Sequence, residues 1–195
     1  YIFQNPADVS QVSSGKYHSC AILDDGSVYC WGSNDFGQRG AGHSYTVSTA
    51  AEQSNLPSGR TASSISAAQY HTCAVLDDAS LYCWGYNSDG QLGLDGVPTG
   101  YGDDAKVREL RPVALPGEAA QVACAWTHTL AVSAGGALLG WGKNNYGQLG
   151  LGHRQGQSLP QPVPLPAGAL RVTSVGSTAG AETRVTHTCV LAVLG

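Results

Sequence analysis

One unit of sequence recurs along this chain of 195 residues, and this internal repeat limits the fold more than any local pattern does. Histidines recur at intervals of 53, 57 and 59 residues, and tryptophans keep step with the first two intervals. The positions are His18, His71, His128 and His187, together with Trp31, Trp84 and Trp141. One supersecondary unit per period is therefore expected, with a fourth unit that starts but is not completed before Gly195.

Each unit reads as a β-hairpin. An apolar strand leads through a short acidic turn into a second apolar strand that ends in Trp-Gly, and helical periodicity is absent. Small antiparallel sheets cannot bury their faces alone, so they stack around an axis as the blades of a propeller. We therefore predict an all-β chain, a single partial β-propeller over residues 1–195 with four-stranded antiparallel blades. The approximate blades are 6–58, 59–109, 110–159 and an incomplete 160–195, about three and a half in all.

The residues shared by the units carry a family resemblance. Two motifs recur, His-Thr/Ser-x-Ala-Leu/Val and Trp-Gly-x-Asn-x-x-Gly-Gln-Leu-Gly, and the Gly, Asn, Gly and Gln of the second keep fixed offsets in all three copies. These motifs resemble the repeat of the regulator of chromosome condensation family. The resemblance implies blades of four antiparallel strands, usually in a closed ring of seven. Since this chain supplies fewer blades, we expect either further chain beyond Gly195 or completion of the arc by another copy.

Two cysteine pairs face each other across the predicted hairpins. With Asp24-Asp25-Gly26 as the turn, residues whose numbers sum to 50 are opposite, which places Cys20 opposite Cys30. If that pair is not hydrogen-bonded, its Cα atoms approach to ~4.5 Å and a disulfide fits. Cys73 and Cys83 repeat the spacing in the second unit. We therefore predict two disulfides within blades.

The third unit acts as a control for this pairing. It has Leu130 and Gly140 at the equivalent positions, so both cysteines are lost together. The alternatives are reduced core cysteines or half of a metal site, although the C-x9-C spacing lacks the short ligand spacing of zinc sites. Disulfides persist in oxidising compartments, so the pairs predict an extracellular protein, a secreted and disulfide-containing variety of the family.

Two further cysteines fall outside these pairs. Cys189 occupies the position of Cys20, and its partner would lie ten residues further on, outside this chain. Cys124 aligns with Ser14 and Ala67, and we expect it to be an ordinary buried small residue.

Charge and composition limit the classes of partner that the chain is expected to bind. Charged residues make up 12 % of the chain, the net charge is −4, and the lysines are limited to Lys16, Lys106 and Lys143. Nothing here forms the basic footprint of a nucleic-acid-binding protein. No run of 18 apolar residues occurs, so membrane insertion is not expected. The chain contains no methionine, even at position 1, and we expect it to be a processed product or a fragment.

The repeated polar residues are interpreted as structural. Equivalent histidines in equivalent blades serve as hydrogen-bonding anchors, and the repeat tryptophans fill the space between blades. The acid pairs Asp24-Asp25 and Asp77-Asp78 are turn residues rather than calcium ligands. No nucleophile, base and orienting acid form a recognisable signature. The chain is predicted not to be an enzyme, and no catalytic, cofactor-binding or metal-binding residue is assigned.

Two functions remain. The first is an extracellular structural, adhesive or assembly module that acts through protein–protein contacts, with a protein or further copies of itself as partner. The alternative is a regulatory propeller that binds one partner protein, as a guanine nucleotide exchange factor or a secreted enzyme inhibitor does. Segments that differ between units, 43–64, 95–111 and 153–168, are candidate binding loops. In an algal or plant setting, the prolines of the last segment would be candidates for hydroxylation and glycan decoration.

Overall fold

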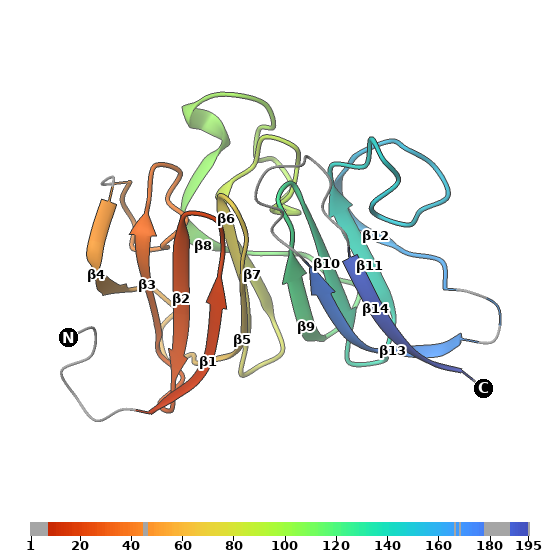
Figure 1. Ribbon diagram of the computed structural model, residues 1–195, viewed down its shortest axis with the longest axis horizontal. Coiled ribbons are helices and arrows are strands. Elements are labelled where there is room, and N and C mark those ends of the chain that lie inside the picture. Colours follow the sequence, from red (N-terminus) through yellow and green to blue (C-terminus); the bar gives the residue numbers. More distant parts are fainter. Residues whose placement is uncertain (1–7, 45–46, 166, 168, 178–187, 195) are drawn as a thin grey trace.

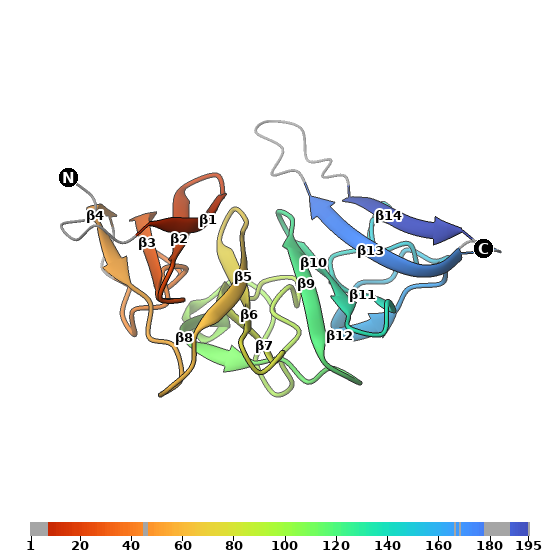
Figure 2. The ribbon, with the colours of Figure 1, turned by 90° about the horizontal axis from the view of Figure 1, so that it is seen from below.

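The structure is a computed structural model, and it describes residues 8–44, 47–165, 167, 169–177 and 188–194. These residues form three four-stranded antiparallel sheets and one two-stranded sheet (Figures 1 and 2). Within each four-stranded sheet the strands lie side by side in chain order. Among the described residues, helical structure is limited to one 3-10 turn, Asp103–Ala105. The predicted all-β architecture is confirmed.

The strand bounds follow the repeat. The first sheet comprises β1 (Val9–Ser14), β2 (His18–Leu23), β3 (Val28–Ser33) and β4 (Val47–Gln53). The second comprises β5 (Ala62–Ala67), β6 (His71–Leu76), β7 (Leu81–Tyr86) and β8 (Lys106–Pro112). The third comprises β9 (Ala119–Cys124), β10 (His128–Ser133), β11 (Leu138–Gly142) and β12 (Gln157–Pro162), and the two-stranded sheet pairs β13 (Ala169–Ser177) with β14 (Thr188–Leu194).

The outer strands differ from the sequence-based boundaries. The boundary expected between residues 109 and 110 falls inside β8, and the one expected between 159 and 160 falls inside β12. Both strands continue to a proline, Pro112 and Pro162. Proline is tolerated there because each is the last residue of an edge strand, where the ladder does not need its missing N–H.

The central hairpins have the predicted register. Cys20 is opposite Cys30 and Cys73 is opposite Cys83. Each pair forms a disulfide, with Cα atoms 4.1 Å apart. The turn that closes the first hairpin has Gly26 at φ 76°, and the second has Ala79 at φ 62°. Ala79 therefore adopts a left-handed conformation that an L-residue with a Cβ rarely takes.

The apolar core lies between consecutive sheets. Cys20, Ile22 and Val28 of the first sheet pack with Ile65 and Trp84 of the second in one buried cluster. A second cluster joins the second and third sheets, and a third joins the third sheet to β13. The inner strands β1, β5, β9 and β13 contact one another in turn, so the sheets fan out in an open arc that Figure 2 shows from below. This arrangement is that of propeller blades.

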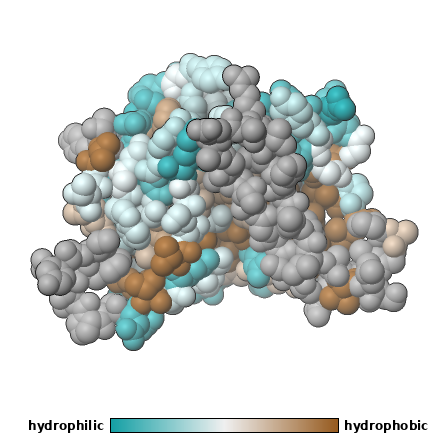
Figure 3. Space-filling model, in the orientation of Figure 1, coloured by the Kyte–Doolittle hydropathy of each residue, from teal (hydrophilic) through white to brown (hydrophobic). Residues whose placement is uncertain are grey.

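The loops gather on one side of the arc. The β3–β4, β7–β8 and β11–β12 connections all lie at the upper side of Figure 1. The β2–β3, β6–β7 and β10–β11 turns lie at the lower side. Figure 3 shows mainly hydrophilic and neutral residues over the upper part of this view, with hydrophobic areas below. Over the described residues, no helix has the length and apolar character needed to cross a membrane.

Candidate functional site

Consecutive blades are joined by a buried chain of polar contacts that starts at each repeat histidine. His18 Nε2 lies 2.7 Å from Thr72 Oγ1, and the Thr72 hydroxyl donates to the Gln38 carbonyl at 2.8 Å. A hydroxyl has a single proton, so Thr72 accepts from His18, and His18 Nε2 must carry the ring proton. The Trp84 indole N–H donates to the same Gln38 carbonyl at 2.8 Å. One loop carbonyl of the first blade therefore anchors two side chains of the second.

The next junction has the same contacts. His71 Nε2 lies 2.9 Å from Thr129 Oγ1, and both Thr129 Oγ1 and the Trp141 indole donate to the Gln91 carbonyl, at 2.8 and 2.9 Å. Burial lowers the pKa of His71 to about 3, helped by the other repeat histidines, and lowers those of His18 and His128 to about 4. These imidazoles are neutral at pH 7 and act as fixed hydrogen-bonding groups.

The repeat tryptophans and the remaining repeat histidines differ in how they are placed and in how deeply they are buried. Trp84 and Trp141 are fully buried, whereas Trp31 is only half-buried, because no described sheet precedes the first one. His128 is fully buried on β10. His187 lies outside the described residues.

The asparagine of each repeat organises the loop that supplies the anchoring carbonyl. Asn87 Oδ1 accepts from the Leu92 amide at 3.0 Å, and Asn144 Oδ1 accepts from the Leu149 amide at 3.0 Å. The Gln91 side chain in turn accepts from the Asp89 amide at 2.8 Å. The Gly-Gln-Leu-Gly motif is thus a loop-building element that presents a carbonyl to the next blade.

On the same side as these loops, aromatic side chains from the first two blades form a contiguous cluster. The rings of Tyr17 and Tyr70 stack with centroids 5.5 Å apart. Phe36 contacts Tyr70 at 4.6 Å and Tyr86 at 4.3 Å. Tyr17 and Tyr70 each directly precede a repeat histidine. Phe36 lies in the loop after β3, and Tyr86 is the last residue of β7.

A pocket of about 400 Å³ continues this cluster toward the third blade. Tyr70 and Tyr86 line one part, Trp126 and Tyr146 line another, and Tyr101 from the β7–β8 loop is 92 % exposed at its edge. We call the Tyr17, Phe36, Tyr70 and Tyr86 cluster together with this pocket the aromatic face. Tyr101 belongs to the variable segment 95–111 that the sequence marked as a candidate binding loop.

Charged groups border the aromatic face. Lys16 Nζ lies 5.1 Å from the centroid of Tyr17 and 5.9 Å from that of Trp126, so one cation spans the first and third blades. Lys143 pairs with Asp89 at 3.3 Å. A hydrogen bond with Lys16 lowers the pKa of the Tyr17 hydroxyl, while burial raises the pKa of Tyr70. The face can therefore offer π surfaces, hydroxyls, ammonium groups and a carboxylate within one concave area.

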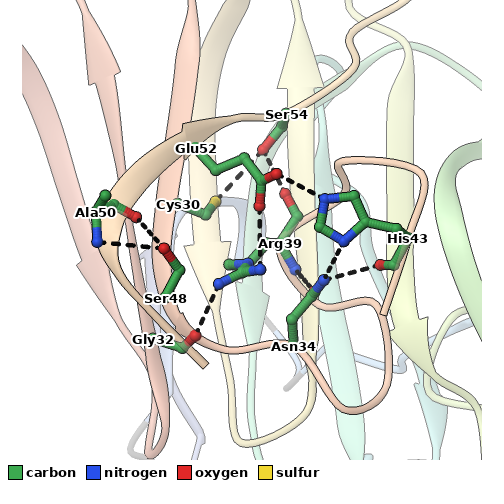
Figure 4. Close-up of polar contacts among 9 residues, drawn as sticks. All are labelled: Cys30, Gly32, Asn34, Arg39, His43, Ser48, Ala50, Glu52 and Ser54. Carbon is green, nitrogen blue, oxygen red and sulfur yellow. Dashed lines mark hydrogen bonds and ion pairs between the residues drawn. The ribbon is translucent and has the colours of Figure 1, made fainter. Parts of the chain in front are cut away.

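The first blade also has a partly buried ion pair that is not repeated among the described residues of the neighbouring blades (Figure 4). Arg39 stands where the other repeats have leucine, and its side chain is almost fully buried. Its guanidinium contacts Glu52 of β4 at 3.1 Å and donates to the Gly32 carbonyl at 3.1 Å. His43 Nε2 lies 2.6 Å from the other Glu52 oxygen. These contacts fasten the β3–β4 loop to the outer strand.

Sequence reasoning missed both the aromatic face and the ion pair. The available signals were an aromatic residue before two of the repeat histidines and an arginine in place of the motif leucine. Neither signal indicates which side chains contact one another in the folded protein.

Comparisons with known proteins match these repeats. The family model described as the regulator of chromosome condensation (RCC1) repeat matches residues 25–75, 78–132 and 135–181, and a second model with that description matches 9–38, 62–91 and 119–148. The ultraviolet-B receptor of Arabidopsis thaliana is 36 % identical over 153 residues, which cover 78 % of this chain and 33 % of the receptor. The secretion-regulating guanine nucleotide exchange factor of Bos taurus is 34 % identical over 139 residues, covering 70 % of this chain and 28 % of that protein.

A solved structure agrees with the fold. Prp20p of Saccharomyces cerevisiae, whose crystal structure was described with its binding to Gsp1p and histones, superposes with a TM-score of 0.76 at 25 % identity. The match covers 86 % of this chain and 41 % of Prp20p. The chain thus spans about a third or less of these two curated relatives and less than half of Prp20p.

Proposed function

Because this chain belongs to the regulator of chromosome condensation (RCC1) repeat family, we propose that it is a regulatory propeller module that binds a protein partner through the aromatic face. In this proposal the module acts by binding rather than by catalysis. It is the second of the two functions that the sequence left open.

The observation that carries the proposal is the concave aromatic pocket at the junction of the second and third blades. Protein-binding hot spots are enriched in tyrosine, tryptophan and arginine, and they cluster in desolvated pockets near the centre of an interface. Tyr70, Tyr86 and Trp126 provide such a centre, and Tyr101 and Tyr146, 92 % and 66 % exposed, provide aromatic surface at its border. Lys143 and Asp89 add a charged pair that can orient a partner segment.

The relatives support a protein partner. Prp20p was described with binding to Gsp1p and histones, and the Bos taurus relative is named as a guanine nucleotide exchange factor that regulates secretion. Since this chain covers only part of each, their partners and activities are not carried over to it. What the proposal carries over is protein binding by a chain of this fold.

The test compares proteins captured by the full chain with those captured by a Trp126→Ala variant. We expect at least one partner whose affinity falls by about tenfold or more, which is the loss typical of a truncated hot spot. Val47→Ala is the matched control, because Val47 is 73 % exposed on β4, outside the aromatic face, and its loss should leave the same partner bound. Partners retained equally by wild type and Trp126→Ala would contradict the proposal.

A second candidate is the assembly role that the sequence favoured first. Val12 on β1 is 58 % exposed, while the residues at the same repeat position, Ile65 and Val122, are 2 % and 7 % exposed. Together with the half-buried Trp31, this leaves the first sheet with an apolar face of the kind that the other blades bury. The occupant that fits this face is a further blade of the same repeat type, from a longer chain or from a second copy.

An extracellular location remains part of this proposal. Two disulfides support it, because such bonds persist in oxidising compartments. Mass spectrometry of protein isolated from its source under thiol-blocking conditions tests it. We expect Cys20–Cys30 and Cys73–Cys83 peptides to be linked, and blocked free thiols at these four positions would contradict the location.

A further inference from the structure

Three potential metal ligands from two different blades meet in the core. His71 and Cys73 lie on β6 of the second blade, and Cys124 ends β9 of the third. Their donor atoms all lie within 4.8 Å of one another, and all three residues are buried. In the structure Cys73 is bound to Cys83, so its sulfur is not available as a thiolate ligand.

We propose that His71, Cys73 and Cys124 form a zinc-binding site when the Cys73–Cys83 disulfide is reduced, so that one sulfur serves either a disulfide or a metal ion. Histidine nitrogen and cysteine sulfur are the donors that zinc prefers. Ligands at about 2.1 and 2.3 Å from a tetrahedral zinc ion lie about 3.6 Å apart, so the side chains need to approach by about 1 Å at most.

One ring nitrogen of His71 carries a lone pair that can bind a metal ion. Its Nε2 proton is donated to Thr129 Oγ1, because the Thr129 hydroxyl donates its own proton to the Gln91 carbonyl. Nδ1 therefore carries a lone pair, and it is a buried atom without a hydrogen-bond partner. Metal-binding histidines are commonly oriented in this way, with the second ring nitrogen donating to a fixed acceptor.

Cys124 is held rigidly beside His71. Its backbone amide donates to Ser66 Oγ at 2.9 Å, which ties the end of β9 to β5 of the neighbouring blade. Burial raises the pKa of the Cys124 thiol to about 12. Zinc binding to a cysteine displaces the thiol proton, so the affinity of the site should weaken as the pH falls.

The switch between the two states is a two-electron reaction. A dithiol reductant transfers two electrons and two protons to the Cys73–Cys83 bond, giving two thiols, and is itself oxidised to a disulfide. Zinc then binds the Cys73 and Cys124 sulfurs and His71 Nδ1, and the two thiol protons go to solvent. A water molecule or the released Cys83 thiol can fill the fourth position.

The first blade provides an internal control. It has the same histidine and the same disulfide, His18 and Cys20–Cys30, but Ala67 stands where Cys124 stands in the third blade. The positions are equivalent, because the Ala67 amide donates to Ser13 Oγ at 2.9 Å just as the Cys124 amide donates to Ser66. The third ligand is therefore specific to the junction of the second and third blades.

The spectroscopic test uses Cys83→Ala, which leaves Cys73 as a thiol without any need to reduce the wild-type disulfide. Kept under argon, this variant should bind one Co²⁺ per chain with thiolate-to-cobalt charge-transfer bands, and Zn²⁺ should displace the cobalt. The double variant Cys83→Ala/Cys124→Ala should bind at least about tenfold more weakly, since even loss of an outer-shell partner costs 10–100-fold. Cys30→Ala, which frees Cys20 beside His18, is the matched control and should show no such site.

A second measurement does not depend on the folding of the Cys83 variants. Wild type and Cys124→Ala, both reduced with a phosphine, are compared by thermal unfolding with and without Zn²⁺. We expect zinc to raise the unfolding temperature of wild type more than that of Cys124→Ala, because a ligand that binds only the folded state stabilises it. Equal zinc responses in this pair, or equal cobalt binding by Cys83→Ala and its double variant, would overturn the proposal.

Discussion

At the scale of single residues, the repeat histidines make stability depend on pH. His18 and His128 titrate at about 4 and His71 at about 3 when folded, because burial disfavours the charged ring. In the unfolded chain each titrates near 6.5, so below that pH the unfolded state takes up protons that the folded state does not. The free energy of unfolding should therefore fall as pH is lowered from about 6.5 to 4, by about 3 kcal/mol for His18 alone.

Urea unfolding at several pH values checks this. His71→Gln should flatten the decline below pH 6.5, while His153→Gln, which replaces an exposed histidine, is the control. Stability that stays constant from pH 6.5 to 4 would show that the repeat histidines accept protons while folded.

A second prediction at the scale of single residues concerns the Arg39–Glu52 ion pair. Glu52→Gln leaves the buried guanidinium without its carboxylate, and it should cost less than the roughly 3–5 kcal/mol of a fully buried pair because Glu52 is one-third exposed. Arg39→Leu restores the residue found in the other repeats and should cost less, since the remaining Glu52 is one-third exposed and can be solvated. In chemical denaturation, Arg39→Leu/Glu52→Gln should be more stable than Glu52→Gln alone, and an additive double variant would contradict the coupling.

At the scale of elements, the glycine that ends the Gly-Gln-x-Gly loop of the first and second blades makes room for the next blade. A Cβ at Gly93 would lie 2.7 Å from Trp141 Nε1, and one at Gly40 would lie 2.8 Å from Trp84 Nε1. The loop and the tryptophan it anchors are therefore in contact at the two junctions between four-stranded sheets. This explains why the loop motif and the tryptophan occur together in the repeat.

Gly93→Ala tests this contact, with Gly96→Ala as a matched control. Both glycines have nearly the same left-handed φ, 70° and 68°, but a Cβ at Gly96 meets nothing within 4 Å. Backbone strain of roughly 1 kcal/mol should affect both variants, and the clash with Trp141 should add about 1–3 kcal/mol to Gly93→Ala alone. Thermal unfolding compares the two, and equal destabilisation would mean that the loop can shift away from the tryptophan.

At the scale of the whole molecule, the open face of the first sheet predicts self-association of the isolated chain. Its exposed Val12 lies where the other blades bury a large aliphatic residue. Burying this surface against a second copy would be favourable by about 25 cal/mol per Å² of apolar area. Head-to-tail contacts of this kind close into rings or continue as fibres.

Sedimentation of residues 1–195 under oxidising conditions should show species larger than the monomer. Val12→Asp should shift the distribution toward monomer, because it places a charge in the contact, whereas Val47→Asp on β4 should not. A stable, cooperatively folding monomer for wild type would rule out the assembly role for this chain alone.

The sequence by itself determined the hairpins, their register, the two disulfides and the propeller class. These features depend on local pairing: Cys20 and Cys30 are only 10 residues apart, and alternation along two strands with a defined turn fixes which residues face each other. The same applies to the repeat, whose period shows in the residue types alone.

Only the tertiary structure decided which residues of different blades contact one another. His18 meets Thr72 across 54 residues, and Cys124 meets His71 and Cys73. The aromatic pocket likewise draws on two blades. Such contacts depend on how one sheet is rotated and shifted against the next, and that placement results from packing of whole faces rather than from any local pattern.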